Sequence, residues 1–186
     1  MGNPFSLGPI RAGETVVDLG CGAGADACVA ALLVGPRGRV VGVDMTPAMV
    51  EKARHNAQLA GLANIEVHES DISRLPLPDA CVDVVISNAM INLAPDKRSV
   101  FREANRVLRS GGRLQFADMV RHGGCAMLPF GDESLRACCV SGRLPVEEVV
   151  SLVQDAGFCD VAFIGFTDYT TSPSTVGALF RASKRT

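Results

Sequence analysis

The 186-residue sequence contains no tryptophan, a single tyrosine, no long apolar run and no cluster of basic residues. No apolar stretch approaches the roughly 20 residues that a membrane-spanning helix needs, and the N-terminus lacks the apolar segment of a signal peptide. With a formal net charge of −2, the chain has no basic patch or tail of the kind that binds nucleic acid. These absences predict a soluble globular protein of the cytoplasm that binds neither membranes nor nucleic acids.

Cysteine and histidine patterns typical of disulfide frameworks and metal sites are also missing. The seven cysteines form no CxxC pair and have no zinc-ligand spacing. An odd number of cysteines, mostly within apolar segments, is typical of reduced thiols in the cytoplasm. The three histidines (His55, His68 and His122) have no spacing that suggests a metal site or a catalytic triad. We therefore predict no metal site and expect these histidines on the surface.

Apolar runs alternate with helical segments along most of the chain. The predicted strands are 15–19, 39–43, 65–68, 82–87 and 113–117, and the predicted helices between them are 25–33, 47–60 and 96–109. A further helix at 145–156 is followed by two apolar runs, 160–166 and 176–182, which fit an antiparallel pair. Strands that alternate with helices at this spacing form a parallel sheet covered on both faces. The length suits a single α/β domain over residues 1–186.

Two of these helices also carry signals for their ends and faces. Thr46 is the predicted N-cap of the second helix, Pro47 suits its first turn, and Gly61 fits its C-terminal stop. Four arginines recur at helical spacing in the third helix, with acidic residues among them, which favours a solvated face over an anion site. These arginines are Arg98, Arg102, Arg106 and Arg109.

The most informative stretch is VVDLGCGAG at residues 16–24, where the first predicted strand ends in alternating glycines. A glycine turn lets a ligand lie directly on the backbone. The string satisfies the dinucleotide pattern GxGxxG/A, in which backbone N–H groups and a helix N-terminus hold a pyrophosphate. However, the carboxylates of Asp18 and Asp26 would flank that dianion. S-adenosylmethionine has no phosphate and carries a sulfonium and an ammonium, so the charges favour it over a dinucleotide.

Polar residues also follow the ends of the other predicted strands. They are Asp18, Asp44, Asp71, Ser87-Asn88 and Asp118. In an open α/β sheet, the ligand lies across the carboxyl ends of the strands. The sequence therefore predicts a ligand site along that one edge.

These residues belong to longer strings by which a family can be recognised. The chain resembles the class I S-adenosylmethionine-dependent methyltransferases across nearly its whole length, and more particularly the arsenite methyltransferases. The strings are GNP (2–4), GVDMTPAMVEKAR (42–54), ISNAMINLAPDKRSVFREANRVLRSGGRL (86–114) and CVSG (139–142). The resemblance implies a Rossmann-like α/β sandwich with a seven-stranded, mostly parallel sheet and an antiparallel C-terminal hairpin. Such proteins carry helices before the first strand, so with fourteen residues there we expect an N-terminal lid that is short or missing.

The resemblance also implies a role for each residue of the cofactor site. Asp18 and the glycine loop would hold the methionine part of S-adenosylmethionine, Asp44 would accept hydrogen bonds from both ribose hydroxyls, and Asn88 would lie near the transfer site. Met45 would pack on the adenine and Asp71 would accept from its amino group, although plain core and an ordinary turn are the alternatives for these two. The predicted cofactor-binding residues are Asp18, Gly20, Cys21, Gly22, Gly24, Asp44, Met45, Asp71, Ile72 and Asn88.

The methyl acceptor is where the sequence departs from the arsenite methyltransferases. Those enzymes hold As(III) with cysteine thiolates, the soft ligands that a soft ion prefers. Their ISNC reads ISNA here, so Ala89 replaces a substrate cysteine, and the cysteines upstream of GNP have no counterpart. Cys139, next to Cys138, is the remaining substrate thiol that the resemblance implies; a packed pair on a helix is the alternative. Three functions stay open: methylation of arsenite, methylation of a small organic acceptor as in related quinone-biosynthesis enzymes, or cofactor binding without transfer. The product of transfer would be S-adenosyl-L-homocysteine.

Overall fold

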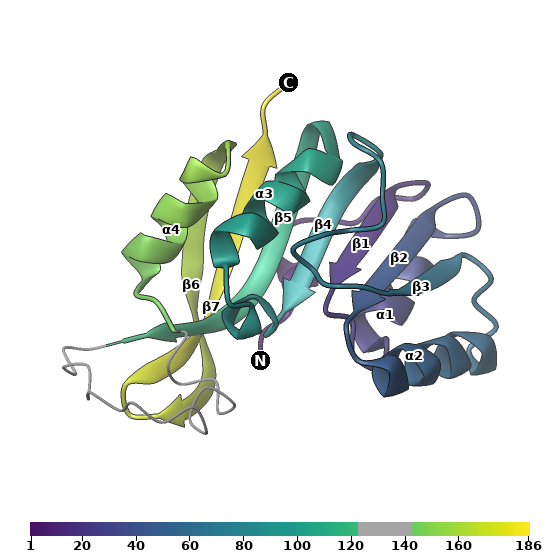
Figure 1. Cartoon of the computed structure of the whole chain (residues 1–186), viewed down its shortest axis with the longest axis horizontal. Helices are drawn as coiled ribbons and strands as arrows, with labels where there is room; N and C mark the ends of the chain where they lie inside the picture. The colour runs from purple at the N-terminus through teal and green to yellow at the C-terminus, as the bar shows by residue number, and fades with distance from the viewer. Residues whose placement is uncertain (123–142) are drawn as a thin grey trace.

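The computed structural model describes residues 1–122 and 143–186. They form a seven-stranded sheet, with the strands in the order β3-β2-β1-β4-β5-β7-β6, and the helices that cover it (Figure 1). The first five strands pair in parallel, and β7 runs antiparallel to both β5 and β6. The strands are β1 (Thr15–Leu19), β2 (Arg39–Asp44), β3 (Ile65–Glu69), β4 (Val82–Asn88), β5 (Leu108–Arg121), β6 (Phe158–Ser172) and β7 (Thr175–Lys184). This is the predicted Rossmann-like sandwich with its antiparallel C-terminal hairpin.

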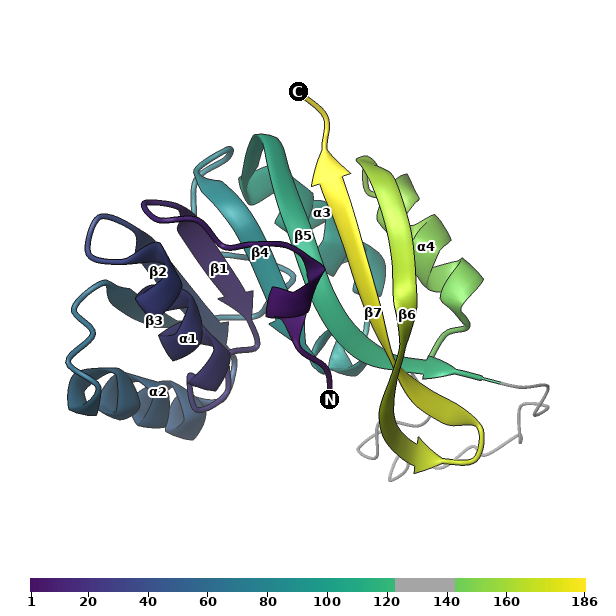
Figure 2. The ribbon, with the colours of Figure 1, turned by 180° about the vertical axis from the view of Figure 1, so that it is seen from behind.

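Helices cover both faces of the sheet. They are α1 (Ala25–Val34), α2 (Pro47–Leu59), α3 (Lys97–Val107) and α4 (Val146–Asp155), with 3-10 turns η1 (Pro4–Leu7) and η2 (Ile91–Leu93). Val17 and its neighbours on one face pack with α3 and α4, whereas Val16 on the other face packs with α1 and α2. Figures 1 and 2 show α3 and α4 on the opposite side of the sheet from α1. Because the central strands are buried on both faces, they read as nearly continuous apolar runs.

The N-terminal residues cross the same face as α1, over β4, β5 and β7 (Figure 2). Phe5 and Ile10 pack against the cluster formed with α1 and α2. Farther along, the carbonyl of Gly8 accepts from the side-chain amide of Gln115 at 3.1 Å. Before them, the carbonyl of Gly2 accepts from the side-chain amide of Asn88 at 3.0 Å, so the start of the chain lies at the carboxyl end of β4.

Three strands are longer than the sequence predicts. β5 already begins at Leu108, because the Ser-Gly-Gly turn expected to separate it from α3 lies within an irregular part of its pairing with β4. At its other end, β5 continues to Arg121, paired with Thr175 of β7. The hairpin of β6 and β7 extends in the same direction (Figure 1). Its tip is rich in threonine and serine and half exposed, so no apolar alternation marked it as strand.

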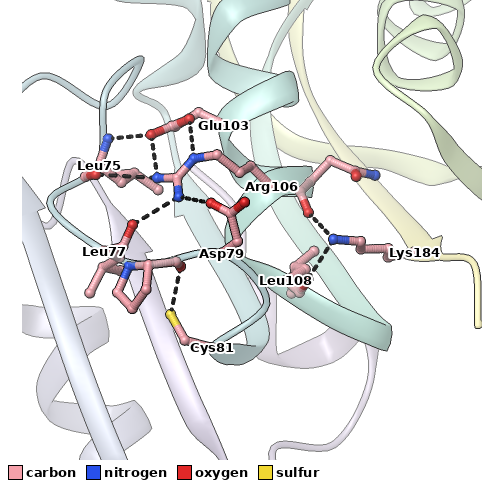
Figure 3. A network of polar contacts seen from close by, with 10 residues as sticks. Leu75, Leu77, Asp79, Cys81, Glu103, Arg106, Leu108 and Lys184 are labelled. Atoms are coloured by element: carbon pink, nitrogen blue, oxygen red, sulfur yellow. Dashed lines mark hydrogen bonds and ion pairs between the residues drawn. The ribbon is translucent and has the colours of Figure 1, made fainter.

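The structure adds detail to two predictions about helix ends and faces. Thr46 occupies the N-cap position of α2, but its side chain makes no capping hydrogen bond; Asp44 accepts from its backbone N–H instead. Gly61 does follow the helix with a φ of +67°, as expected of a stop. The arginine face of α3 is not uniformly solvated, because the guanidinium of Arg106 is enclosed by the loop before β4 and by Glu103 (Figure 3).

Within the described residues, no helix is both long and apolar enough to cross a membrane. The same part of the chain contains no group of three or more histidine, cysteine or acidic side chains placed to hold a metal ion.

Candidate functional site

The sheet brings the predicted strand-end residues to one edge. Leu19 of β1 lies in register with Val43 of β2 on one side and Ser87 of β4 on the other, so the three strands end together. The acids Asp18 and Asp44 and the amide Asn88 therefore meet along this edge, as the sequence predicts.

The glycine loop after β1 is held against β2 by its own backbone. The N–H groups of Gly20 and Cys21 both donate to the carbonyl of Val43, at 2.7 and 3.0 Å. Gly22 has a φ of +52°, and a Cβ added there would meet nothing within 4 Å. At this point the loop presents bare backbone with free space above it, which is the property that a ligand-binding glycine turn requires.

Gly20 is needed for a different reason, which the sequence did not reveal. A Cβ built on it would lie 2.3 Å from Cγ of Met90, so the Met90 side chain packs directly on the Gly20 backbone. Met90 is turned toward the loop by Ala89, whose φ of +68° is uncommon for a residue with a side chain. The backbone strain at Ala89 could not be inferred from an Ala-Met pair.

Asp44 is the buried anchor between the loop and β2. It is 3% exposed; Oδ2 accepts from the N–H of Gly22 and Oδ1 from the N–H of Thr46, both at 2.9 Å. A carboxylate offers about four acceptor sites. Two acceptor sites of Asp44 therefore remain for hydrogen-bond donors of a ligand, and a pair of ribose hydroxyls would fill them.

Asp18 and Asn88 contribute unpaired acceptors to the same edge. Asp18 is 2% exposed, and its Oδ2 has no hydrogen-bond partner. Burial, together with the neighbouring carboxylates of Asp26 and Asp44, raises the pKa of Asp18 to about 8. The amide of Asn88 donates to Asp26 and to the carbonyl of Gly2, both at 3.0 Å, while its buried Oδ1 is unpaired. Buried acceptors without donors are costly.

These unpaired acceptors and carboxyl groups distinguish the two cofactors that fit the glycine pattern. A pyrophosphate at the loop would lie close to the carboxyl groups of Asp18, Asp26 and Asp44, and among the described residues no basic side chain lowers the pKa of Asp18. The ammonium of S-adenosylmethionine supplies the donors and the positive charge that the unpaired acceptors lack. The residues present therefore fit S-adenosylmethionine.

At the predicted adenine end, Asp71 lies in a turn after β3. Its Oδ1 accepts from the N–H of Ser73 at 2.7 Å and from the Ser73 hydroxyl at 2.8 Å, so the turn alternative describes this oxygen. The next residue, Ile72, is buried in the core cluster that includes Leu75. Met45, which directly follows Asp44 in the chain, is 69% exposed, which rules out plain core.

Two other strand-end residues do not face this edge freely. Asp118 is 5% exposed and accepts from the N–H and the side-chain amide of Asn92, at 3.0 and 2.7 Å. It therefore clamps the segment after β4, and burial raises the pKa of its carboxyl. The Ser87 hydroxyl donates to the carbonyl of Leu19 inside the sheet.

Of the two cysteines with a predicted role at the site, Cys21 lies in the glycine loop and Cys139 lies outside the described residues. Burial, with the charges of Asp18 and Asp44, raises the pKa of Cys21 to about 12, so this thiol is not a nucleophile at neutral pH. Cys21 contributes its backbone N–H to the loop instead. Cys139, the predicted substrate thiol, lies with Cys138 outside the described residues.

A sheet of this order, with a glycine loop after β1 and acids at the ends of its first strands, defines the fold of the class I methyltransferases. Residues 10–157 match the family model described as a methyltransferase domain. The chain belongs to this family, which confirms the predicted resemblance to the methyltransferases.

Individual relatives narrow the likeness further. An arsenite methyltransferase of Halobacterium salinarum is 44% identical over 84% of this chain, which spans 40% of that protein. An aklanonic acid methyltransferase of a Streptomyces species is 36% identical over 60% of the chain, which spans 51% of it. Among solved structures, an arsenic(III) S-adenosylmethionine methyltransferase from Chlamydomonas reinhardtii is 32% identical, with a TM-score of 0.80 over 96% of this chain and 66% of its own. The chain thus spans well under half of the Halobacterium relative.

Proposed function

We propose that this protein binds S-adenosylmethionine along the ends of β1 to β4 and transfers its methyl group to a small-molecule acceptor. The observation that carries the proposal is the buried, unpaired Oδ2 of Asp18 behind an open glycine loop. When bound, S-adenosylmethionine supplies the electrophilic methyl group, so the protein needs to bind and align the reactants more than to move protons.

Each residue has a defined part in this proposal. Asp18 and the Oδ1 of Asn88 face the amino group of the cofactor, and the backbone at Gly22 allows its methionine part to approach closely. Asp44 accepts from the ribose, while Asp71, Ile72 and Met45 hold the adenine. Gly20, Cys21 and Gly24 shape the loop. The role of Asp44 is supported by the two acceptor sites that its backbone hydrogen bonds leave free.

For the acceptor, we propose trivalent arsenic supplied with a small thiol. The matched relatives named arsenite methyltransferases support this choice. A three-coordinate As(III) prefers thiolates, and this chain offers Cys139, with Cys138 beside it, but no thiol at Ala89. We infer that a small-molecule thiol completes the coordination that Ala89 cannot provide.

A small organic acceptor is the second candidate. The alanine at position 89 favours it, because a methyl side chain there leaves an apolar surface in place of a soft ligand. The similarity to an aklanonic acid methyltransferase is consistent with such a substrate. Cofactor binding without transfer is the third possibility that the substitution at position 89 allows.

The test begins with calorimetric titration of the reduced protein with S-adenosylhomocysteine, with Asp44→Ala in parallel. One-site binding that the substitution weakens supports the cofactor site, and failure of the wild-type protein to bind overturns the proposal. Methyl transfer is then measured with arsenite and a thiol, following S-adenosylhomocysteine and methylated arsenic together. Product formed with an organic acceptor but not with arsenite would select the second candidate.

We also propose that the protein acts in the cytoplasm on a small molecule, with no nucleic acid or membrane as partner. Within the described residues, Cys21, Cys28, Cys81 and Cys159 are free thiols, which agrees with a reducing compartment.

A further inference from the structure

The guanidinium of Arg106 binds the loop between β3 and β4 to helix α3 (Figure 3). Two of its N–H groups form a pair with the carboxylate of Glu103, at 2.7 and 2.8 Å. Two others donate to the carbonyls of Leu75 and Leu77, at 3.3 and 2.9 Å, and the last donates to Asp79 at 2.6 Å. All five donors of the guanidinium are used, in the forked geometry that only arginine offers.

Glu103 contributes a direct contact to the same loop. Its Oε1 accepts from the N–H of Leu75 at 2.7 Å, so both backbone groups of Leu75 are bound by this ion pair. The side chain of Glu103 is 15% exposed and that of Arg106 is 31% exposed. By contrast, Arg98 at the start of the same helix pairs with Asp155 with nearly half of each side chain in solvent. Solvent therefore screens the Glu103–Arg106 ion pair less than it screens the Arg98–Asp155 ion pair.

Leu75, which this pair holds, directly follows the turn that carries Asp71. The hydroxyl of Ser70 donates to the carbonyl of Arg74 at 2.9 Å, and the N–H of Arg74 donates to the carbonyl of Asp71 at 3.0 Å. At the other end of the turn, the N–H of Ser70 donates to the carbonyl of Asp44 at 3.0 Å. The turn is thus fixed on one side by β2 and on the other by Leu75.

We propose that Glu103 and Arg106 are positioning residues for adenine recognition, because they hold the turn in which Asp71 and Ile72 meet the purine. This inference rests on the proposed S-adenosylmethionine site. Neither residue touches the cofactor; both act through the backbone of Leu75. Asp71 is exposed, and within the described residues its carboxylate accepts hydrogen bonds from Ser73 alone, so its place at the edge depends on where this turn lies.

A ligand pair that differs at N1 and at C6 of the purine tests the inference. S-inosylhomocysteine carries an oxygen where S-adenosylhomocysteine carries the adenine amino group, so it presents an acceptor to Asp71 in place of a donor. The measured quantity is the dissociation constant of S-inosylhomocysteine divided by that of S-adenosylhomocysteine, both obtained by calorimetry. We expect the wild-type protein to favour S-adenosylhomocysteine at least tenfold and Asp71→Ala to bring the ratio close to one.

Glu103→Gln and Arg106→Lys are the test variants, and Arg98→Ala is the matched control on the same helix. Both test variants should lower the ratio at least threefold, whereas the control should leave it unchanged. Glu103→Gln retains the size of the side chain and an acceptor for Leu75, so it keeps the test informative if Arg106→Lys does not fold. A general loss of packing would weaken both ligands equally and leave the ratio as it is.

Each result has one meaning. A wild-type protein that binds neither ligand contradicts the proposed function and, with it, this inference. A wild-type protein that binds both equally shows that Asp71 does not read the amino group and overturns the inference alone. An unchanged ratio in folded Glu103→Gln overturns the positioning role, while the proposed function stands.

Discussion

The backbone N–H of Gly22 donates a hydrogen bond to Oδ2 of Asp44 at 2.9 Å, joining the glycine loop to the tip of the neighbouring strand. The same carboxylate accepts from Thr46 at the start of α2. One side chain thus aligns the open backbone of the loop with the proposed ribose site. A substitution at Asp44 should therefore affect both the shape of the loop and direct contact with the ligand.

Asp44→Asn should weaken the binding of S-adenosylhomocysteine at least tenfold. The amide nitrogen replaces one of the two oxygens and must face the N–H of either Gly22 or Thr46, so one buried donor loses its acceptor. Asp83→Asn is the matched control, because Asp83 accepts from the N–H of Thr15 at the opposite end of the strands. The control should lose stability without losing affinity. Equal affinity losses in the two variants would contradict a specific role for Asp44.

The affinity for S-adenosylhomocysteine should rise with pH up to about 8. The pKa of Asp18 is raised to about 8, chiefly by burial, so at neutral pH most of the carboxyl is protonated in the ligand-free protein. An ammonium ligand favours the ionised form, and below the pKa its binding must release a proton. The dissociation constant should fall by up to about tenfold for each pH unit between about 6 and 8. Calorimetry in buffers of different ionisation enthalpy measures the proton release, and Asp18→Asn should abolish both effects.

The stability of the ligand-free protein should change with pH in the opposite sense. An unfolded aspartate ionises near pH 3.9, whereas folded Asp18 keeps its proton to about pH 8. Between these values the native state binds the extra proton, so the contribution of Asp18 to the free energy of unfolding falls as pH rises. Denaturant unfolding at several pH values compares the wild type with Asp18→Asn. The slope attributable to Asp18 should be absent in the variant; identical slopes would contradict the raised pKa.

Gly22→Ala should abolish cofactor binding at a modest cost in stability. Its φ of +52° strains any residue with a Cβ, by about 1–2 kcal/mol, and no atom lies within 4 Å of the added methyl group. Gly61→Ala is matched to it: the φ there is +67°, and the space is equally empty, but the residue follows α2 away from the loop. Both variants should lose similar free energy of unfolding, and only Gly22→Ala should lose S-adenosylhomocysteine. If Gly22→Ala binds normally, the ligand does not lie on this backbone.

The parts of the fold and site that could be predicted are those in which local sequence and burial agree. The strands β1 and β2 are nearly continuous valine runs, because both faces are covered, and Asp18 and Asp44 end them within the same register. Their carboxylates could therefore be assigned to one edge. The packing of Met90 on Gly20 could not be predicted, because it depends on a left-handed backbone at Ala89.

Long-range contacts account for the other differences. Helical spacing indicates which arginines of α3 share a face, but not that the loop before β4 covers Arg106. Similarly, the exposed end of the β6–β7 hairpin has no buried face to impose alternation on Thr170 and its neighbours. The substrate thiol at Cys139 is a prediction that still rests on the sequence resemblance.

Ala89→Cys should raise arsenite-dependent formation of S-adenosylhomocysteine at least tenfold. Alanine already bears the Cβ that strains this left-handed position, so cysteine adds a thiol without adding backbone strain. The thiolate would supply the soft ligand that the proposed As(III) site lacks at the segment after β4. The measurement follows S-adenosylhomocysteine and methylated arsenic with arsenite and a thiol present. Ala89→Ser, nearly the same in size but with a hard oxygen, is the control and should not increase transfer. If Ala89→Cys stays inert while an organic acceptor is methylated by the wild type, the acceptor is organic and the proposal of arsenic is wrong.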